Sequence, residues 1–175
     1  MKRLFQYALP LIFACKATVA PPNNDTLVQD SQRQKDTYYQ LAKLVPDSVL
    51  TADSLAFMVL PLQASCPSCR DKALDSIIQF KERVPKGHYI ILSLKGGQKY
   101  IKHFFKNAGH KQIPEIPGVM FIDSVDKAGD FELYHSNPAF YYTSSGNVYR
   151  KISALPATVK EDLSEFFRGY RPKSK

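Results

Sequence analysis

The sequence predicts an α/β domain in which a β-sheet is flanked by helices, and three observations support this fold class. Two short apolar runs, 55–62 and 89–92, have the length and composition of buried strands. Each run is followed by a segment with apolar residues at helical spacing, at 70–83 and at 98–108. Further along, 139–152 holds two β-rich runs joined by a turn of Ser, Gly and Asn, which is typical of a hairpin.

Three more elements complete the expected order along the chain. A helix is expected over 36–44, where the apolar residues share one side, and Pro46 ends it. A short strand is expected over 119–122, between the second of the helices above and the hairpin. A closing helix over 162–170 again places its apolar residues on one side. The expected order is therefore helix, strand, helix, strand, helix, strand, hairpin and helix.

The size and charge of the chain limit the classes of function. It has 175 residues, a hydrophobic fraction of 44% and a formal net charge of +8, which suit one domain with one core. The positive charge is concentrated at 95–111 and 168–175, but no basic stripe on one element is interleaved with stacking aromatic residues. We therefore expect no nucleic-acid partner, and we interpret the charge as solvated surface near acidic partners or membrane headgroups.

The first residues have the pattern of an export signal. Lys2 and Arg3 form a basic start, and 4–14 is an apolar run too short to span a bilayer as a helix. The run ends at Cys15, which follows a small residue, and this end resembles the lipoprotein box of bacteria. The alternative is ordinary cleavage after Ala20, because small residues occupy both recognition positions there. Both alternatives predict an exported protein.

These patterns divide the chain into three parts. We expect a lipoprotein-type signal peptide over 1–14, a flexible tether over 15–35 and one folded domain over 36–172. The tether segment is expected to be flexible because it is polar and has few large apolar residues. Lipidated Cys15 would then attach the protein to a membrane, and the expected location is the periplasm or cell envelope.

The motif Cys66-Pro67-Ser68-Cys69 is the strongest functional signal, because it lies between a predicted strand and a predicted helix. The first sulfur is thereby expected at a helix N-terminus, where free N–H groups and the positive end of the helix dipole stabilise a thiolate. The thiolate is the reactive species in thiol–disulfide exchange. The motif therefore predicts a redox-active disulfide that needs no other cofactor.

The same cysteines admit other interpretations. They could form an inert structural disulfide, which the junction position disfavours. A zinc site is disfavoured because four ligands are usual and the sequence holds no second Cys-x-x-Cys or His-x-x-x-His pair. A metal that accepts fewer ligands, such as copper(I), remains an open alternative.

The order of strand, Cys-Pro-Ser-Cys, helix, strand, helix, proline-led hairpin and closing helix resembles the thioredoxin superfamily, and especially its exported members in Gram-negative bacteria. The resemblance covers roughly 36–171 and implies a thioredoxin-like fold with a central mixed sheet. The segment 138–148 is similar to the cis-proline strand of that family. By this likeness Pro138 would be a cis-proline packed against the disulfide, and Asn137 would pair its backbone with the substrate. A simple strand-opening proline on a sheet edge is the alternative.

The resemblance also implies roles for the motif residues. Cys66 would attack a substrate disulfide, and Cys69 would resolve the mixed disulfide that results. Pro67 suits the first turn of a helix, and the hydroxyl of Ser68 would stabilise the Cys66 thiolate by donating a hydrogen bond. Pro67 and Ser68, together with Asn137 and Pro138, are the residues expected to contact the substrate. Whether the pair reduces or oxidises its substrates is left open, because that depends on its potential.

The expected partners are exported proteins that carry thiols or disulfides, and a membrane thiol-relay protein that exchanges electrons with the pair. Two alternatives belong to other classes. A thioredoxin-like copper-binding or copper-delivery protein would use Cys66, Cys69 and His135, since His135 lies three residues before Pro138. A thioredoxin-like module that binds an exported partner without chemistry is the other.

Overall fold

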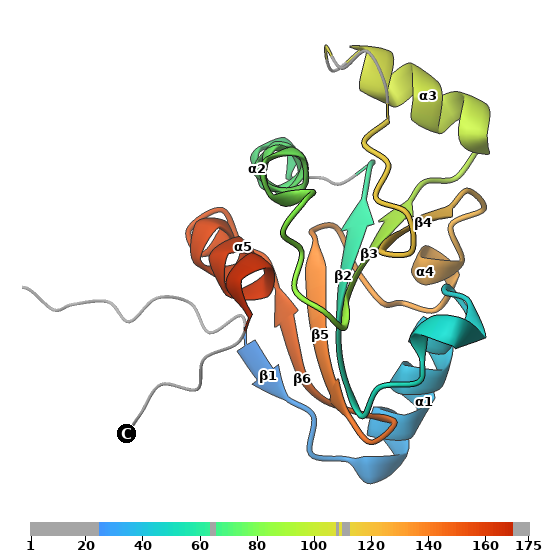
Figure 1. Ribbon diagram of the computed structural model, residues 1–175, viewed down its shortest axis with the longest axis vertical. Helices are drawn as coiled ribbons and strands as arrows, with labels where there is room; N and C mark the ends of the chain where they lie inside the picture. Colours follow the sequence, from blue (N-terminus) through green and yellow to red (C-terminus); the bar gives the residue numbers. More distant parts are fainter. Residues whose placement is uncertain (1–24, 64–65, 108, 110–112, 170–175) are drawn as a thin grey trace, which may run out of the picture.

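A computed structural model of the chain describes residues 25–63, 66–107, 109 and 113–169. Its centre is a six-stranded sheet with the order β1-β6-β5-β2-β3-β4 (Figure 1). The strands are β1 (Asp25–Leu27), β2 (Ser54–Pro61), β3 (His88–Ser93), β4 (Met120–Asp123), β5 (Ala139–Ser144) and β6 (Asn147–Ser153). The helices are α1 (Ser31–Ala42), α2 (Pro67–Phe80), α3 (Gln98–Asn107), α4 (Lys127–Asp130) and α5 (Val159–Arg168), with a 3₁₀ turn at Asp47–Val49.

The sheet is mixed, and β2 lies inside it. β2 pairs in parallel with β3 and antiparallel with β5, while β3 pairs in parallel with β4. β5 and β6 form the predicted hairpin, and β1 adds antiparallel to the free side of β6. A strand covered on both faces needs a continuous apolar sequence, and β2 is buried at every position after Ser54.

The two faces of the sheet hold two separate parts of the core. Successive side chains of a strand point to opposite faces. Met58 and Leu60 pack with buried residues of α2 and α5, whereas Phe57 and Val59 pack with Leu41 of α1. Accordingly α2 and α5 lie on one side of the sheet and α1 and α4 on the other (Figure 1). This arrangement of layers and strands is thioredoxin-like, and the predicted fold class is confirmed.

The predicted elements are present, with differences at their ends and two additions. The expectation of a flexible tether as far as residue 35 is wrong for the described residues 25–35, because β1 pairs with β6 and α1 begins at Ser31. The Asp30 carboxylate caps α1 by accepting hydrogen bonds from the N–H groups of Gln32 and Arg33. The four-residue helix α4 was also not expected.

The predictions for the signal peptide, for lipidation of Cys15 and for cleavage after Ala20 fall on residues outside those that the structure describes. Within the described residues, no helix has both the length and the apolar character needed to cross a bilayer.

Candidate redox site

The Cys pair lies where β2 gives way to α2, as the sequence predicts. Cys66 is the N-cap residue of α2, and Pro67 occupies the first helical turn. The carbonyl oxygen of Cys66 accepts hydrogen bonds from the N–H groups of Cys69 and Arg70, each at 3.1 Å. The two cysteines form a disulfide, with their Cα atoms 5.3 Å apart.

The first sulfur receives the hydrogen bonds expected at a helix N-terminus. The N–H of Cys69 donates to Cys66 Sγ over 3.3 Å, and the Ser68 hydroxyl lies 3.6 Å from the same sulfur. The first turn of α2 contains no acidic residue that would oppose a negative charge. These groups would stabilise a thiolate at Cys66 once the disulfide is reduced.

The two sulfurs differ in their access to solvent. Cys66 is half-buried and is flanked by the exposed residues Pro67 and Ser68, whereas Cys69 is 0% exposed and belongs to the core beneath α2. A reagent or substrate therefore meets Cys66 first, and Cys69 is reached only through the disulfide that joins it to Cys66.

Arg70 is a residue near the pair that sequence reasoning did not single out. Its guanidinium pairs with the Asp71 carboxylate at 2.8 Å, donates to the carbonyl of Leu62 at 3.4 Å and lies 5.0 Å from the ring centroid of Phe104. The last contact joins the start of α2 to α3. The only signal in the sequence was its position directly after Cys69.

The structure places Pro138 at the expected end of the sheet but corrects its peptide bond. Ala139, the next residue, pairs with Val59 of β2, so Pro138 lies at the end of β2 that leads into the Cys motif. Pro138 is buried, and the described residues contain no cis peptide bond, so the cis-proline prediction is wrong. The trans form is the intrinsically preferred one, and Pro138 opens an inner strand with its carbonyl accepting from the N–H of Ala154 at 2.8 Å.

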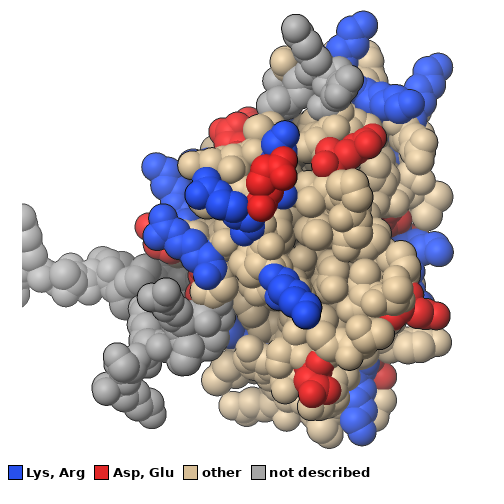
Figure 2. All heavy atoms as spheres, in the orientation of Figure 1, with Lys and Arg blue, Asp and Glu red and all other residues tan. Residues whose placement is uncertain are grey.

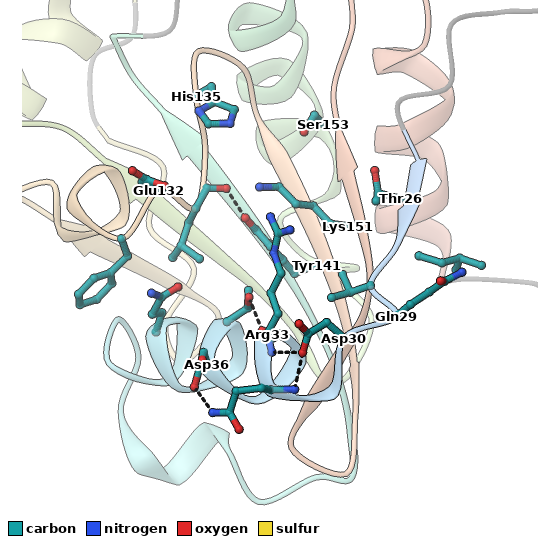
Figure 3. A pocket seen from close by; sticks show the side chains of 17 residues that line it. Thr26, Gln29, Asp30, Arg33, Asp36, Glu132, His135, Tyr141, Lys151 and Ser153 are labelled. Carbon is teal, nitrogen blue, oxygen red and sulfur yellow. Dashed lines mark hydrogen bonds between the residues drawn. The ribbon is translucent and has the colours of Figure 1, made fainter.

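His135 lies at a different place from the cysteines. It is exposed, and it lines a cavity of about 610 Å³ together with residues of β1, α1 and β6 (Figure 3). Within the described part of the chain, no three His, Cys, Asp or Glu side chains are grouped as metal ligands. The ligand set of the copper alternative is therefore not assembled. The segment before β5 brings His135 to the α1 side instead.

Two basic side chains line the cavity beside His135. Lys151 and Arg33 line it from β6 and α1, and their side chains point toward one another (Figure 3). Burial lowers the pKa of Lys151, and the positive charge of Arg33 lowers it further. Beneath them Tyr141 donates its hydroxyl hydrogen to the Leu133 carbonyl. Asp30, which caps α1, is also among the lining residues, so the cavity as a whole carries both signs of charge.

No family model and no curated protein matches the chain. Among solved structures it is similar to a secreted disulfide oxidoreductase of Mycobacterium tuberculosis homologous to E. coli DsbE, with 13% identity and a TM-score of 0.41 over 65% of this chain and 80% of that one. StoA from Bacillus subtilis has 15% identity and a TM-score of 0.39, covering 66% and 87%. The N-terminal domain of PilB from Neisseria gonorrhoeae has 15% identity and a TM-score of 0.41, covering 79% and 94%. The fold assignment rests on the strand order and the position of the Cys pair rather than on these distant likenesses.

Proposed function

We propose that this thioredoxin-like protein is a thiol–disulfide oxidoreductase whose active centre is the Cys66–Cys69 pair. One observation carries the proposal. The accessible sulfur sits at a helix N-terminus and accepts a backbone hydrogen bond, while its partner is fully buried one turn further along the helix. A structural disulfide needs neither this difference in access nor a stabilised thiolate.

The exchange takes place in two steps. The Cys66 thiolate attacks one sulfur of a substrate disulfide, so that the substrate S–S bond breaks, a mixed disulfide forms and one substrate thiolate leaves. Cys69 then loses its proton and attacks the Cys66 sulfur, which releases the second substrate thiolate and forms the Cys66–Cys69 disulfide. Two electrons pass from the pair to the substrate, whose thiolates take up protons. The reverse sequence oxidises a substrate dithiol.

The residues around Cys66 would guide the substrate. Pro67 and Ser68 are exposed beside the sulfur, and Asn137 is half-buried just before Pro138, at the same end of the sheet. We propose that an extended substrate segment runs between these two places, with the backbone of Asn137 forming strand-like hydrogen bonds to it. The trans form of the Asn137–Pro138 bond does not alter which end of the sheet they occupy.

The proposed setting follows from the N-terminal sequence. A basic start, a short apolar run and Cys15 support export to the periplasm or cell envelope, with a lipid anchor at Cys15. The partners there would be exported proteins with thiols or disulfides, and a membrane protein that resets the pair.

The test is the redox potential of the pair in purified protein carrying Cys15→Ser, so that only the motif cysteines titrate. The protein is equilibrated against glutathione and dithiothreitol buffers, and the fraction oxidised is measured by alkylation and mass. A value near about −270 mV would mark a reductant and one near about −120 mV an oxidant. A pair still oxidised below about −300 mV would be a structural disulfide, and the proposal would then be wrong.

A further inference from the structure

The basic residues of the middle segment gather on one helix beside the Cys pair. The sequence contains no Asp or Glu from Lys86 to Pro114. Within this stretch α3 exposes Lys99, Lys102 and Lys106, while its Ile101 and Phe105 face the core. Blue Lys and Arg side chains project from the corner of the molecule where α3 lies (Figure 2). α3 therefore presents a positively charged outer face.

A groove separates this helix from the redox motif. Its volume is about 350 Å³, and its walls come from the end of β2, the start of α2, the end of β3 and α3. The lining residues are Gln63, Arg70, Leu94, Tyr100, His103, Phe104 and Asn107. Tyr100 is 60% exposed, a large aromatic side chain open to solvent. It also borders a second hollow, of about 450 Å³, that the three lysines line.

Two residues of the groove wall are close in sequence to the disulfide. Gln63 lies three residues before Cys66, and Arg70 directly follows Cys69. The Arg70 guanidinium, held by Asp71 and the Leu62 carbonyl, lies 5.0 Å from the ring centroid of Phe104 on the opposite wall. A polypeptide that presents a disulfide to Cys66 therefore has the groove and the lysines of α3 within its reach on that side.

The charges on this face are available to a partner. Asp71 is already paired with Arg70. Among the described residues, none of the three lysines of α3 forms an ion pair. An acidic chain would thus meet unpaired cations around the second hollow and, across Tyr100 and His103, the adjoining groove, whose walls include Leu94 and Phe104. A flat membrane surface could meet the lysines but would not fill the groove.

We propose that the face formed by α3 and this groove selects the substrate of the Cys pair, favouring acidic polypeptide segments that carry an apolar side chain near the reacting cysteine. The lysines attract the acidic residues, and the groove between Arg70 and Tyr100 receives the apolar side chain. This inference rests on the proposed oxidoreductase function and names the class of its substrate. Exposed charges act mainly on the rate of encounter, and salt weakens their effect.

The test uses the full chain with Cys15→Ser and the motif pair reduced. Its second-order rate constant is measured with three disulfides by acid quench and mass analysis. Two are peptides of equal length with one internal disulfide and one Leu, flanked by Asp and Glu in the first and by Lys in the second. The third is hydroxyethyl disulfide, which carries neither a charge for the lysines nor an apolar side chain for the groove.

Two triple charge-reversal variants provide the comparison. The first replaces all three exposed lysines of α3: Lys99→Glu, Lys102→Glu and Lys106→Glu. The second makes the same change in net charge at exposed lysines elsewhere: Lys35→Glu, Lys86→Glu and Lys160→Glu. Tyr100→Ala tests the groove separately, using an acidic peptide with Leu and the same peptide with Gly in its place.

In the unaltered protein the acidic peptide should react roughly tenfold faster than the basic one at low salt, and the preference should shrink at 1 M salt, where the Debye length is about 3 Å. The α3 variant should lose or reverse this preference, the control variant should keep most of it, and hydroxyethyl disulfide should react equally with all. Tyr100→Ala should slow the Leu peptide more than the Gly peptide.

Equal rates with the acidic and basic peptides would overturn this inference and leave the oxidoreductase function standing. An equal loss of the preference for the acidic peptide in both triple variants would also overturn it, because the net charge of the protein, and not the position of the lysines, would then explain the preference. Binding of the protein to anionic phospholipid vesicles through the α3 lysines, without any peptide preference, would assign them to a membrane surface instead. A reduced protein that reacts with none of the three disulfides would overturn the proposed function, and this inference with it.

Discussion

The imidazole of His88 packs against the ring of Phe166, with the ring centroids 5.0 Å apart, where β3 meets α5. Burial lowers the pKa of His88 below its usual 6.5, and a backbone hydrogen bond with Phe166 offsets part of this effect. Its Nδ1 faces no hydrogen-bond partner among the described residues. The folded protein therefore holds this histidine neutral at a pH where the unfolded chain already protonates it.

This contact makes folding stability depend on pH. Because the folded pKa is the lower one, the unfolded state binds the proton first, so stability is complete above the unfolded pKa of 6.5 and falls as the pH drops through it. The loss per pH unit from this one group is at most about 1.4 kcal/mol. The check is the free energy of urea unfolding at pH 8 and pH 5.5 for the protein and for His88→Gln.

The His88→Gln variant should show a smaller difference between the two pH values. His103→Gln serves as the control, because it makes the same substitution at an exposed histidine of α3. An identical slope in the protein and in His88→Gln would show that His88 is not the group responsible.

Replacing the two motif cysteines should have different effects. Cys66→Ala should abolish turnover of a disulfide substrate, because Cys69 is fully buried and cannot attack in its place. Cys69→Ala should instead accumulate a mixed disulfide with the substrate at Cys66, visible on a non-reducing gel and removed by dithiothreitol. Normal turnover by Cys69→Ala would contradict the resolving role of Cys69.

Ser68 should influence how reactive Cys66 is. Its hydroxyl lies 3.6 Å from Cys66 Sγ, so Ser68→Ala removes one potential donor to the thiolate. We expect alkylation of reduced Cys66 by iodoacetamide at pH 7 to slow by about two- to fivefold, the size of a weak hydrogen bond. Ser76→Ala, a matched change further along α2, should leave the rate unaltered. Equal rates in all three proteins would remove Ser68 from the site.

Two adjacent isoleucines of α2 provide a test of the fold. Ile77 is 0% exposed within the core beneath α2, and Ile78 is 38% exposed. Ile77→Ala should cost about 2–5 kcal/mol of unfolding free energy because it leaves a cavity, and Ile78→Ala under about 1 kcal/mol. Urea unfolding of both variants measures the difference. Similar losses at the two positions would contradict the orientation of α2.

The sequence predicted the fold where local pattern and tertiary packing agree. The continuous apolar run of β2 and the helical spacing of α5 show directly which positions the core requires. β1 escaped prediction because Asp25-Thr26-Leu27 has no strand pattern of its own and is ordered by pairing with β6. The start of α1 was misplaced because the capping signal at Asp30, ahead of a polar first turn, went unrecognised.

The sequence predicted those features of the candidate site that depend on neighbouring residues, and not those that depend on contacts between distant segments. A helix N-terminus at Cys66 follows from adjacent residues, and so do the buried Cys69 and the early Pro67. The isomer of Pro138 and the position of His135 depend on how the long segment after β4 returns to the sheet, which spacing along the chain does not determine. The contact of Arg70 with Phe104 joins two helices distant in sequence and left no local pattern.

The burial of Cys69 also determines which atom of the motif can be linked covalently to a partner. With one of the two sulfurs closed to solvent, a partner can be linked to the motif through a single atom, Cys66 Sγ. Every trapped conjugate at the motif should then share one linkage and one stoichiometry. Such a population is chemically uniform, so peptide mapping of it would find a single attachment point on this chain.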